Sequence, residues 1–101
     1  MTFTGKVSDV PAGTLLAVKV DGKPVAVASL DGQLFAVSDI CTHRGCSLAE
    51  GELKGSAVVC PCHRSEFDMK NGEVLAGPAR EPVAVYPVQV SGDEFTISST
   101  S

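Results

Sequence analysis

Two short segments, Cys41-Thr42-His43-Arg44-Gly45-Cys46 and Cys60-Pro61-Cys62-His63, contain all four cysteines and both histidines of this 101-residue chain. Each segment directly follows an apolar run, residues 34–40 for the first and residues 57–59 for the second. Short apolar runs of this kind favour buried strands, so each segment is expected on a loop that leaves a strand. The two loops are predicted to face each other from a rigid sheet and to bring thiols and imidazoles together.

Four side chains in these segments form a candidate ligand set. Read as C-x-H, sixteen further residues and C-x2-H, the pattern selects two thiolates and two imidazoles. A [2Fe-2S] cluster with two cysteines on one iron and two histidines on the other uses the same donors. The candidate ligands are Cys41, His43, Cys60 and His63. The spacing favours one such cluster per chain, with buried thiolates and with imidazoles that keep an N–H near the surface.

Three other kinds of site use the same residue types. Structural zinc sites also accept two cysteines and two histidines, but they favour pairs of like ligands, whereas here each half combines one cysteine with one histidine. Two disulfides in a secreted domain would leave the histidines unexplained, and the chain shows no signal peptide. A catalytic cysteine–histidine pair would leave the paired spacing unexplained. The cluster is therefore the favoured interpretation, with zinc as the main alternative.

Turn signals divide the rest of the chain into short segments. They recur at residues 11–13, 21–22, 31–32, 71–72 and 92–93, between runs of β-branched and apolar residues. No stretch has sustained helical periodicity beyond a single turn around residues 48–50. The fold class is therefore predicted to be all-β. The expected strands are Leu15–Val20, Pro24–Ser29, Leu34–Ser38, Ala57–Cys60, Ser65–Asp68, Val83–Val90 with Pro87 at a bulge or edge, and Phe95–Ser98.

Length and charge set limits on function. A chain of 101 residues fits one domain, residues 1–101. The net charge of −4, with no uninterrupted basic run, argues against general nucleic-acid binding. The first residues do not combine a charged segment with an apolar core, and no stretch of about 20 apolar residues occurs. We therefore expect a cytoplasmic protein without a membrane anchor or a nucleic-acid partner.

The two cysteine–histidine segments resemble the cluster-binding boxes of Rieske proteins. The similarity continues through residues 47–51 and 67–74 to a Gly77-Pro78-Ala79 loop, and it covers roughly residues 5–98. What the resemblance implies for the fold is an antiparallel β-sandwich with a small cluster-binding subdomain at about residues 40–80.

The resemblance also implies a role for each ligand. Cys41 and Cys60 would bind an inner iron, and His43 and His63 would bind an outer one. The loop around Pro78 would cover the cluster from a third side. One Rieske-type [2Fe-2S] cluster per chain is therefore the expected cofactor.

The other two cysteines, Cys46 and Cys62, bear on the branch of the family. They occupy the places where Rieske subunits of quinol-oxidising complexes carry a disulfide, which ferredoxins of aromatic-ring dioxygenases usually lack. Those subunits are tethered to a membrane, whereas the length of this chain and residues 47–51 resemble a free-standing ferredoxin. We expect a soluble ferredoxin with a Cys46–Cys62 disulfide, although cytosolic thiols are normally reduced.

By the same resemblance, Ser65 and Phe67 tune the reduction potential. Ser65 matches a serine that donates a hydrogen bond to a sulfur atom of the site, and Phe67 stands where high-potential members have a tyrosine that donates a second one. Such bonds stabilise the reduced state. One donor out of two predicts a potential between the ends of the Rieske span of roughly −150 to +300 mV. Phe67 also fits a plain core aromatic.

The resemblance implies a one-electron carrier rather than an enzyme. It would take electrons from a flavin-dependent ferredoxin reductase and pass them to a terminal oxygenase. Arg44 and Arg64 each directly follow a predicted histidine ligand, so they are expected either to form a positive rim that orients docking or to be ordinary solvated residues. Two alternatives stay open. One is a small Rieske subunit of a larger oxidoreductase, like those of nitrite reductase or arsenite oxidase, and the other is a zinc-stabilised binding module.

Overall fold

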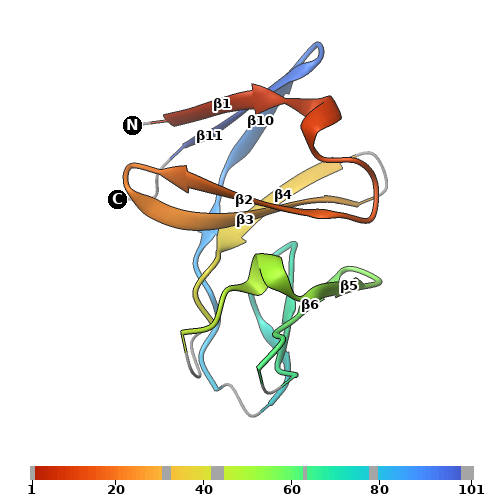
Figure 1. Ribbon diagram of the computed structural model, residues 1–101, viewed down its shortest axis with the longest axis vertical. Coiled ribbons are helices and arrows are strands. Elements are labelled where there is room, and N and C mark those ends of the chain that lie inside the picture. Colours follow the sequence, from red (N-terminus) through yellow and green to blue (C-terminus); the bar gives the residue numbers. More distant parts are fainter. Residues whose placement is uncertain (1, 31–32, 42–44, 63, 78–79, 99–101) are drawn as a thin grey trace.

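The chain forms eleven short strands and no α-helix within residues 2–30, 33–41, 45–62, 64–77 and 80–98, which the computed structural model describes (Figure 1). The all-β prediction is confirmed. Within the same ranges, no helix has the length and apolar character needed to span a bilayer. The elements are β1 (Thr2–Lys6), η1 (Val7–Asp9, a 3₁₀ turn), β2 (Leu15–Val20), β3 (Lys23–Leu30), β4 (Gln33–Ser38), η2 (Leu48–Glu50, a 3₁₀ turn), β5 (Glu52–Lys54), β6 (Ala57–Val59), β7 (Glu66–Asp68), β8 (Val74–Ala76), β9 (Val85–Tyr86), β10 (Val88–Ser91) and β11 (Glu94–Ser98).

The strands pair into three antiparallel sheets, which Figure 1 shows one above another. Their strand orders are β1-β11-β10, β2-β3-β4-β9 and β5-β6-β7-β8. Asp21 and Gly22 form the turn between β2 and β3, and both have positive φ, 54° and 78°. An Asp-Gly pair suits such a turn because two positive φ angles match the twist of a tight hairpin. The sheet β2-β3-β4-β9 is the middle layer.

The middle sheet separates two apolar cores, because successive residues of a strand point to opposite faces. On β3, Val25 and Val27 pack with residues of β11, whereas Ala26 and Ala28 pack with residues of β6 and β7. We call this second cluster the site core. Its buried members are Ala26, Ala28, Val37, Cys41, Leu48, Val58, Cys60, Phe67, Met69 and Val83.

The predicted strands correspond closely to those of the structure, with one error. The strand at residues 15–20 has the predicted bounds, and five others differ by one residue at one or both ends. The prediction of a single strand over residues 83–90 is wrong. β9 pairs with β4 and β10 pairs with β11, so the chain changes sheets at Pro87. Proline has no N–H to donate to a ladder, which ends β9 at this point.

Two glycines allow segments next to the cysteines to approach closely. A Cβ atom on Gly51 would overlap the carbonyl oxygen of Val59, the last residue of β6. Gly72 has a φ of 76°, and a Cβ atom there would overlap the carbonyl oxygen of Val83. The Val83 N–H donates a hydrogen bond to the Gly72 carbonyl oxygen (3.0 Å). The turn after β7 is therefore held against the segment that enters β9, which closes the site core on this side.

Candidate metal centre

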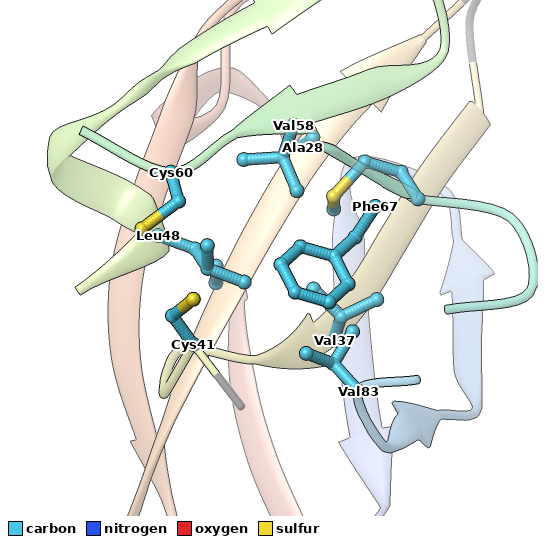
Figure 2. Close-up of a cluster of buried hydrophobic side chains, with 10 residues drawn as sticks. Ala28, Val37, Cys41, Leu48, Val58, Cys60, Phe67 and Val83 are labelled. Carbon is cyan, nitrogen blue, oxygen red and sulfur yellow. The ribbon is translucent and has the colours of Figure 1, made fainter. Parts of the chain in front are cut away.

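Cys41 and Cys60 lie together inside the site core, with exposed fractions of 2% and 1%. Cys41 follows β4 of the middle sheet, and Cys60 directly follows β6 of the sheet below it. Neither takes part in a disulfide. Figure 2 shows both thiols at the same end of the core, next to Leu48. The two cysteine loops therefore face each other as predicted, but they leave two different sheets rather than one.

The first cysteine loop closes on itself through its backbone. The Cys41 N–H donates to the Cys46 carbonyl oxygen (2.9 Å), and the Gly45 N–H donates to the Cys41 carbonyl oxygen (2.8 Å). Gly45 has a φ of 73°. Glycine adopts this left-handed conformation readily because it has no Cβ atom. These two hydrogen bonds join the ends of the first cysteine loop, which we call the first ring.

The second cysteine loop repeats this ring. The Cys60 N–H donates to the Ser65 carbonyl oxygen (2.7 Å), and the Arg64 N–H donates to the Cys60 carbonyl oxygen (3.0 Å). Arg64 occupies the place that glycine holds in the first ring, and its φ is 60°. For a residue with a Cβ atom, the left-handed conformation costs about 1 kcal/mol or more. The buried cysteines therefore begin two rings of the same hydrogen-bond pattern, a match that their sequences do not reveal.

Asp39 anchors the chain that follows the first ring. Its carboxylate accepts hydrogen bonds from the Ser47 hydroxyl (2.6 Å) and from the Ala49 N–H (2.7 Å). Its carbonyl oxygen accepts from the Leu48 N–H (2.7 Å). The side chain is largely buried. η2 is thereby fixed to the end of β4, and Leu48 is held beside the thiols. The sequence analysis did not single out Asp39, whose only signal is an acidic residue directly after a strand.

Replacing Asp39 by alanine should lower the free energy of unfolding by about 2–3 kcal/mol, because a hydroxyl and an N–H would lose a charged acceptor at a partly buried site. Urea unfolding followed by circular dichroism measures this change. Asp9→Ala is the matched control, since the Asp9 carboxylate accepts one exposed, long hydrogen bond, from the Lys6 N–H (3.4 Å). We expect Asp9→Ala to lower the free energy of unfolding by less than about 0.5 kcal/mol. Equal losses for the two variants would contradict the anchoring role.

A disulfide joins the two cysteine loops through Cys46 and Cys62, whose Cα atoms are 6.4 Å apart. The predicted disulfide is therefore present in the structure. Cys46 is half-buried and Cys62 is exposed. The sulfur atoms of Cys46, Cys60 and Cys62 all lie within 4.8 Å of one another. The disulfide thus directly borders one of the two buried thiols.

Ser65 and Phe67, the two residues expected to tune the potential, are both fully buried. Phe67 belongs to the site core, where Figure 2 shows its ring between Val58 and Val83. Phe67 therefore is a core aromatic, whatever further role its position has. Four predicted site residues, His43, Arg44, His63 and Pro78, lie outside the described residues.

Arg64 is exposed and lines a small hollow of about 110 Å³ beside the second ring. Glu50 and Glu52 line the same hollow. Two acidic residues thus share the lining of this hollow with Arg64. This local acidity was not predicted, because Glu50 and Glu52 share the hollow with Arg64 only once η2 and β5 have folded beside the second ring.

The donor chemistry of this centre fits a [2Fe-2S] cluster. Two thiols that are outside any disulfide meet in a dry core, and each is the first residue of a ring whose segment also contains a histidine. Two cysteines and two histidines are the ligands of a Rieske centre. The buried thiols and the disulfide beside them therefore suit an iron–sulfur group held between the two loops.

Comparison with known proteins agrees with this chemistry. Residues 1–87 match the family model described as Rieske [2Fe-2S] domain. This chain belongs to the Rieske family. The biphenyl dioxygenase ferredoxin subunit of Pseudomonas sp. (strain KKS102) is 40% identical over 100 residues, which cover 96% of this chain and 92% of the relative.

Solved Rieske structures have the same fold. The ferredoxin of carbazole 1,9a-dioxygenase from Nocardioides aromaticivorans IC177 superposes with a TM-score of 0.92 at 29% identity, covering 96% of this chain and 95% of that one. A ferredoxin solved in a complex of reduced oxygenase and oxidised ferredoxin of carbazole 1,9a-dioxygenase gives a TM-score of 0.87 at 34% identity. The match covers 92% of this chain and 96% of that ferredoxin.

These similarities establish the class of protein. The chain is a Rieske-type electron carrier, and its cofactor is a [2Fe-2S] cluster. Its relatives are named as ferredoxin components, which carry electrons and are not themselves catalysts. The resemblance noted in the sequence is confirmed, and so are the fold class and the cofactor. The zinc-stabilised module is replaced by the cluster.

Proposed function

We propose that this Rieske protein transfers single electrons from a flavin-dependent ferredoxin reductase to the terminal oxygenase of an aromatic-ring dioxygenase system. The observation that supports this most is the similarity, along nearly the whole chain, to a biphenyl dioxygenase ferredoxin subunit. The ferredoxin that was solved with its oxygenase adds support for the acceptor. The reductase as donor follows from the family resemblance alone, and the cytoplasmic location stays a prediction.

Stopped-flow spectroscopy with the holoprotein tests this proposal. A flavin-dependent reductase of a biphenyl dioxygenase system should reduce the oxidised protein, and the matching terminal oxygenase should then reoxidise it. The apoprotein, which lacks the cluster, is the control and should transfer no electrons. A holoprotein that shows the rhombic EPR signal of a Rieske centre after chemical reduction, but that no such reductase or oxygenase engages, would overturn the partner assignment.

For the centre itself, we propose Cys41 and Cys60 as ligands of one iron and His43 and His63 as ligands of the other, within a cluster-binding subdomain of about residues 40–80. The bound cluster supplies reversible one-electron chemistry. The chain supplies the rest. Its two rings hold the thiols in place by backbone hydrogen bonds, and the site core keeps water away from them. Fixed donors of this kind need little rearrangement when the charge of the centre changes.

The burial of Ser65 and Phe67 supports their proposed effect on the potential. Ser65→Ala should lower the reduction potential, and Phe67→Tyr should raise it, because a hydrogen bond to a sulfur ligand stabilises the reduced state. Each change should be on the order of 65–110 mV, which for a one-electron couple corresponds to a charge-assisted hydrogen bond of about 1.5–2.5 kcal/mol. Spectroelectrochemical titration of the holoproteins measures both shifts.

Ser29→Ala is the matched control for these potentials. Ser29 is also buried, but it lies on β3 two residues after Val27, on the face of the middle sheet away from the site core. We expect the reduction potential of the Ser29→Ala variant to equal that of the unmodified protein. If Ser29→Ala and Ser65→Ala shifted the potential equally, or if Phe67→Tyr left it unchanged, the tuning role of positions 65 and 67 would be wrong.

We also propose that Arg44 and Arg64 orient docking of a partner. The strained left-handed backbone of Arg64 supports this, since such strain is often kept at functional positions. Arg64→Glu should slow association with the oxygenase about three- to tenfold at low ionic strength, and salt should remove most of the difference. Glu50→Gln should have the opposite effect, because it removes a negative charge from the lining of the hollow that Arg64 shares.

Lys19→Glu provides the control for this docking prediction. Lys19 is exposed on β2 of the middle sheet, and the substitution changes net charge by the same amount as Arg64→Glu. Rates measured by stopped-flow over a series of salt concentrations should therefore separate a local effect from an effect of total charge. Equal slowing by the two substitutions, or a salt profile unchanged by Arg64→Glu, would rule out a docking role for Arg64.

A further inference from the structure

The disulfide and one buried thiol form a group of three sulfur atoms. Those of Cys46, Cys60 and Cys62 lie within 4.8 Å of one another. Their exposure increases in steps, from buried Cys60 through half-buried Cys46 to exposed Cys62, so the group has a path to solvent. Cys41, the other buried thiol, is not a member of this group. The three-sulfur group therefore overlaps the proposed cluster ligands only at Cys60.

Reduction would convert this group into three thiols. Two molecules of a thiol reductant break the Cys46–Cys62 bond, giving two cysteine thiols and one molecule of oxidised reductant, so atoms and electrons balance. A tetrahedral zinc ion has Zn–S bonds of about 2.3 Å, which place its sulfur ligands about 3.8 Å apart. In the structure the Cys60 sulfur lies within 4.8 Å of both disulfide sulfurs, whereas the bonded sulfurs of Cys46 and Cys62 are much closer to each other than this spacing. After reduction, rotation of the Cys46 and Cys62 side chains would have to separate their sulfurs before all three could surround one ion.

We infer that reduction of the Cys46–Cys62 disulfide opens a three-thiolate site for Zn²⁺, formed by Cys46, Cys60 and Cys62. Thiolates are preferred ligands of zinc, and binding releases the thiol protons to solvent. The fourth position is left to water, as in open zinc sites. This site differs from the two-cysteine, two-histidine zinc site considered from the sequence, because it uses no histidine and does not use Cys41.

The site has a consequence for cofactor selection, which rests on the proposed role of Cys60 as a cluster ligand. A thiolate that holds Zn²⁺ is not available to iron, so zinc in this site prevents cluster assembly. While the disulfide is intact, Cys46 and Cys62 cannot bind the ion. The disulfide therefore protects the centre against zinc, in addition to any effect on stability.

Thiol footprinting of the full-length apoprotein tests the site directly. The chain is reduced, given one equivalent of Zn²⁺ or none, and treated briefly with an alkylating reagent, and the modified cysteines are identified by mass spectrometry. Zinc should slow alkylation of Cys46, Cys60 and Cys62 at least tenfold and that of Cys41 less than twofold. Protection of Cys41 together with Cys60 alone, or no protection, would overturn the inference.

Two variants sharpen this footprint. Cys62→Ser removes one ligand and should abolish the protection of Cys46 and Cys60. Cys41→Ser leaves the three-sulfur group intact and should keep the protection pattern. Loss of protection in Cys41→Ser together with its retention in Cys62→Ser would overturn the assignment. The zinc footprint of the unmodified chain tests the inference even if either variant folds poorly.

Cluster reconstitution tests the protective role and separates it from the proposed function. Zn²⁺ added before iron and sulfide should cut the iron content at least tenfold in the reduced chain and less than twofold in the chain with its disulfide. Equal inhibition of the two forms would overturn the protective role. If the oxidised chain without zinc took up no cluster, or if Cys60→Ser took up as much as the unmodified chain, the ligand assignment would fail while the footprint of the three-thiolate site still stood.

Discussion

Cys60→Ser should abolish the iron–sulfur centre altogether. Cys60 is 1% exposed, and its ring holds it in the site core with Cys41. A serine hydroxyl does not replace a thiolate as a soft ligand at this position. We expect an iron content below about one tenth of that of the unmodified protein, with no visible absorbance and no EPR signal after reduction. Iron analysis and spectroscopy of the purified variant measure this loss.

Cys41→Ser should behave like Cys60→Ser, whereas Cys46→Ser/Cys62→Ser should keep its cluster. The double variant is the matched control because it replaces two cysteines, one more than Cys60→Ser, but leaves both buried thiols in place. Circular dichroism shows whether each variant keeps its strands. Full iron content in Cys60→Ser, or a double variant that loses iron as completely as Cys60→Ser, would falsify the division of the four cysteines into ligands and disulfide.

The Cys46→Ser/Cys62→Ser variant should lose stability even though it keeps the cluster. The disulfide links residues 16 positions apart in the chain. In the chain-entropy model, removing a cross-link around a loop of this size destabilises the folded state by about 3 kcal/mol. For a domain of about 100 residues, this corresponds to a melting temperature lower by about 12–24 °C. Thermal unfolding followed by circular dichroism measures the change.

A reducing agent provides an independent check of the disulfide. The unmodified protein, once reduced, should melt near the temperature of the double variant, because both lack the same cross-link. The double variant itself should not respond to the reducing agent. A melting temperature within about 3 °C of that of the unmodified oxidised protein would mean that the disulfide contributes little to stability, and its main role would then be the exclusion of zinc.

The sequence predicted the middle sheet and the pairing of the cysteine loops well. Residues 15–20 have the predicted bounds because β-branched residues alternate there between two clear turn signals. Cys41 and Cys60 meet because each follows a buried strand, which short apolar runs indicate reliably. β5 was missed because Glu52-Leu53-Lys54 contains a single apolar residue, and β8 was missed although its three apolar residues form a run as long as that of β6. β1 was missed because its threonines, glycine and lysine form no apolar run.

Features that depend on tertiary contacts could not be predicted from the sequence alone. Asp39 resembles any acidic residue at the end of a strand until η2 folds back and brings the Ser47 hydroxyl and the Ala49 N–H to its carboxylate. The left-handed backbone of Arg64 was hidden because arginine gives no signal for positive φ. The change of sheet at Pro87 depends on which strand lies beside each half of the segment, and a pattern of valines does not contain that information.

The two matched rings bear on how such carriers diverge in evolution. Each ring is closed by hydrogen bonds among its own six residues, so the local geometry of the centre depends on a small part of the chain. Substitutions in the strands that preserve their buried faces leave that geometry unchanged. A lineage can therefore replace much of its sheet surface, and with it its choice of redox partner, without rebuilding the centre. The ferredoxin that shares this fold at a TM-score of 0.92 with only 29% identity illustrates how far such drift can go.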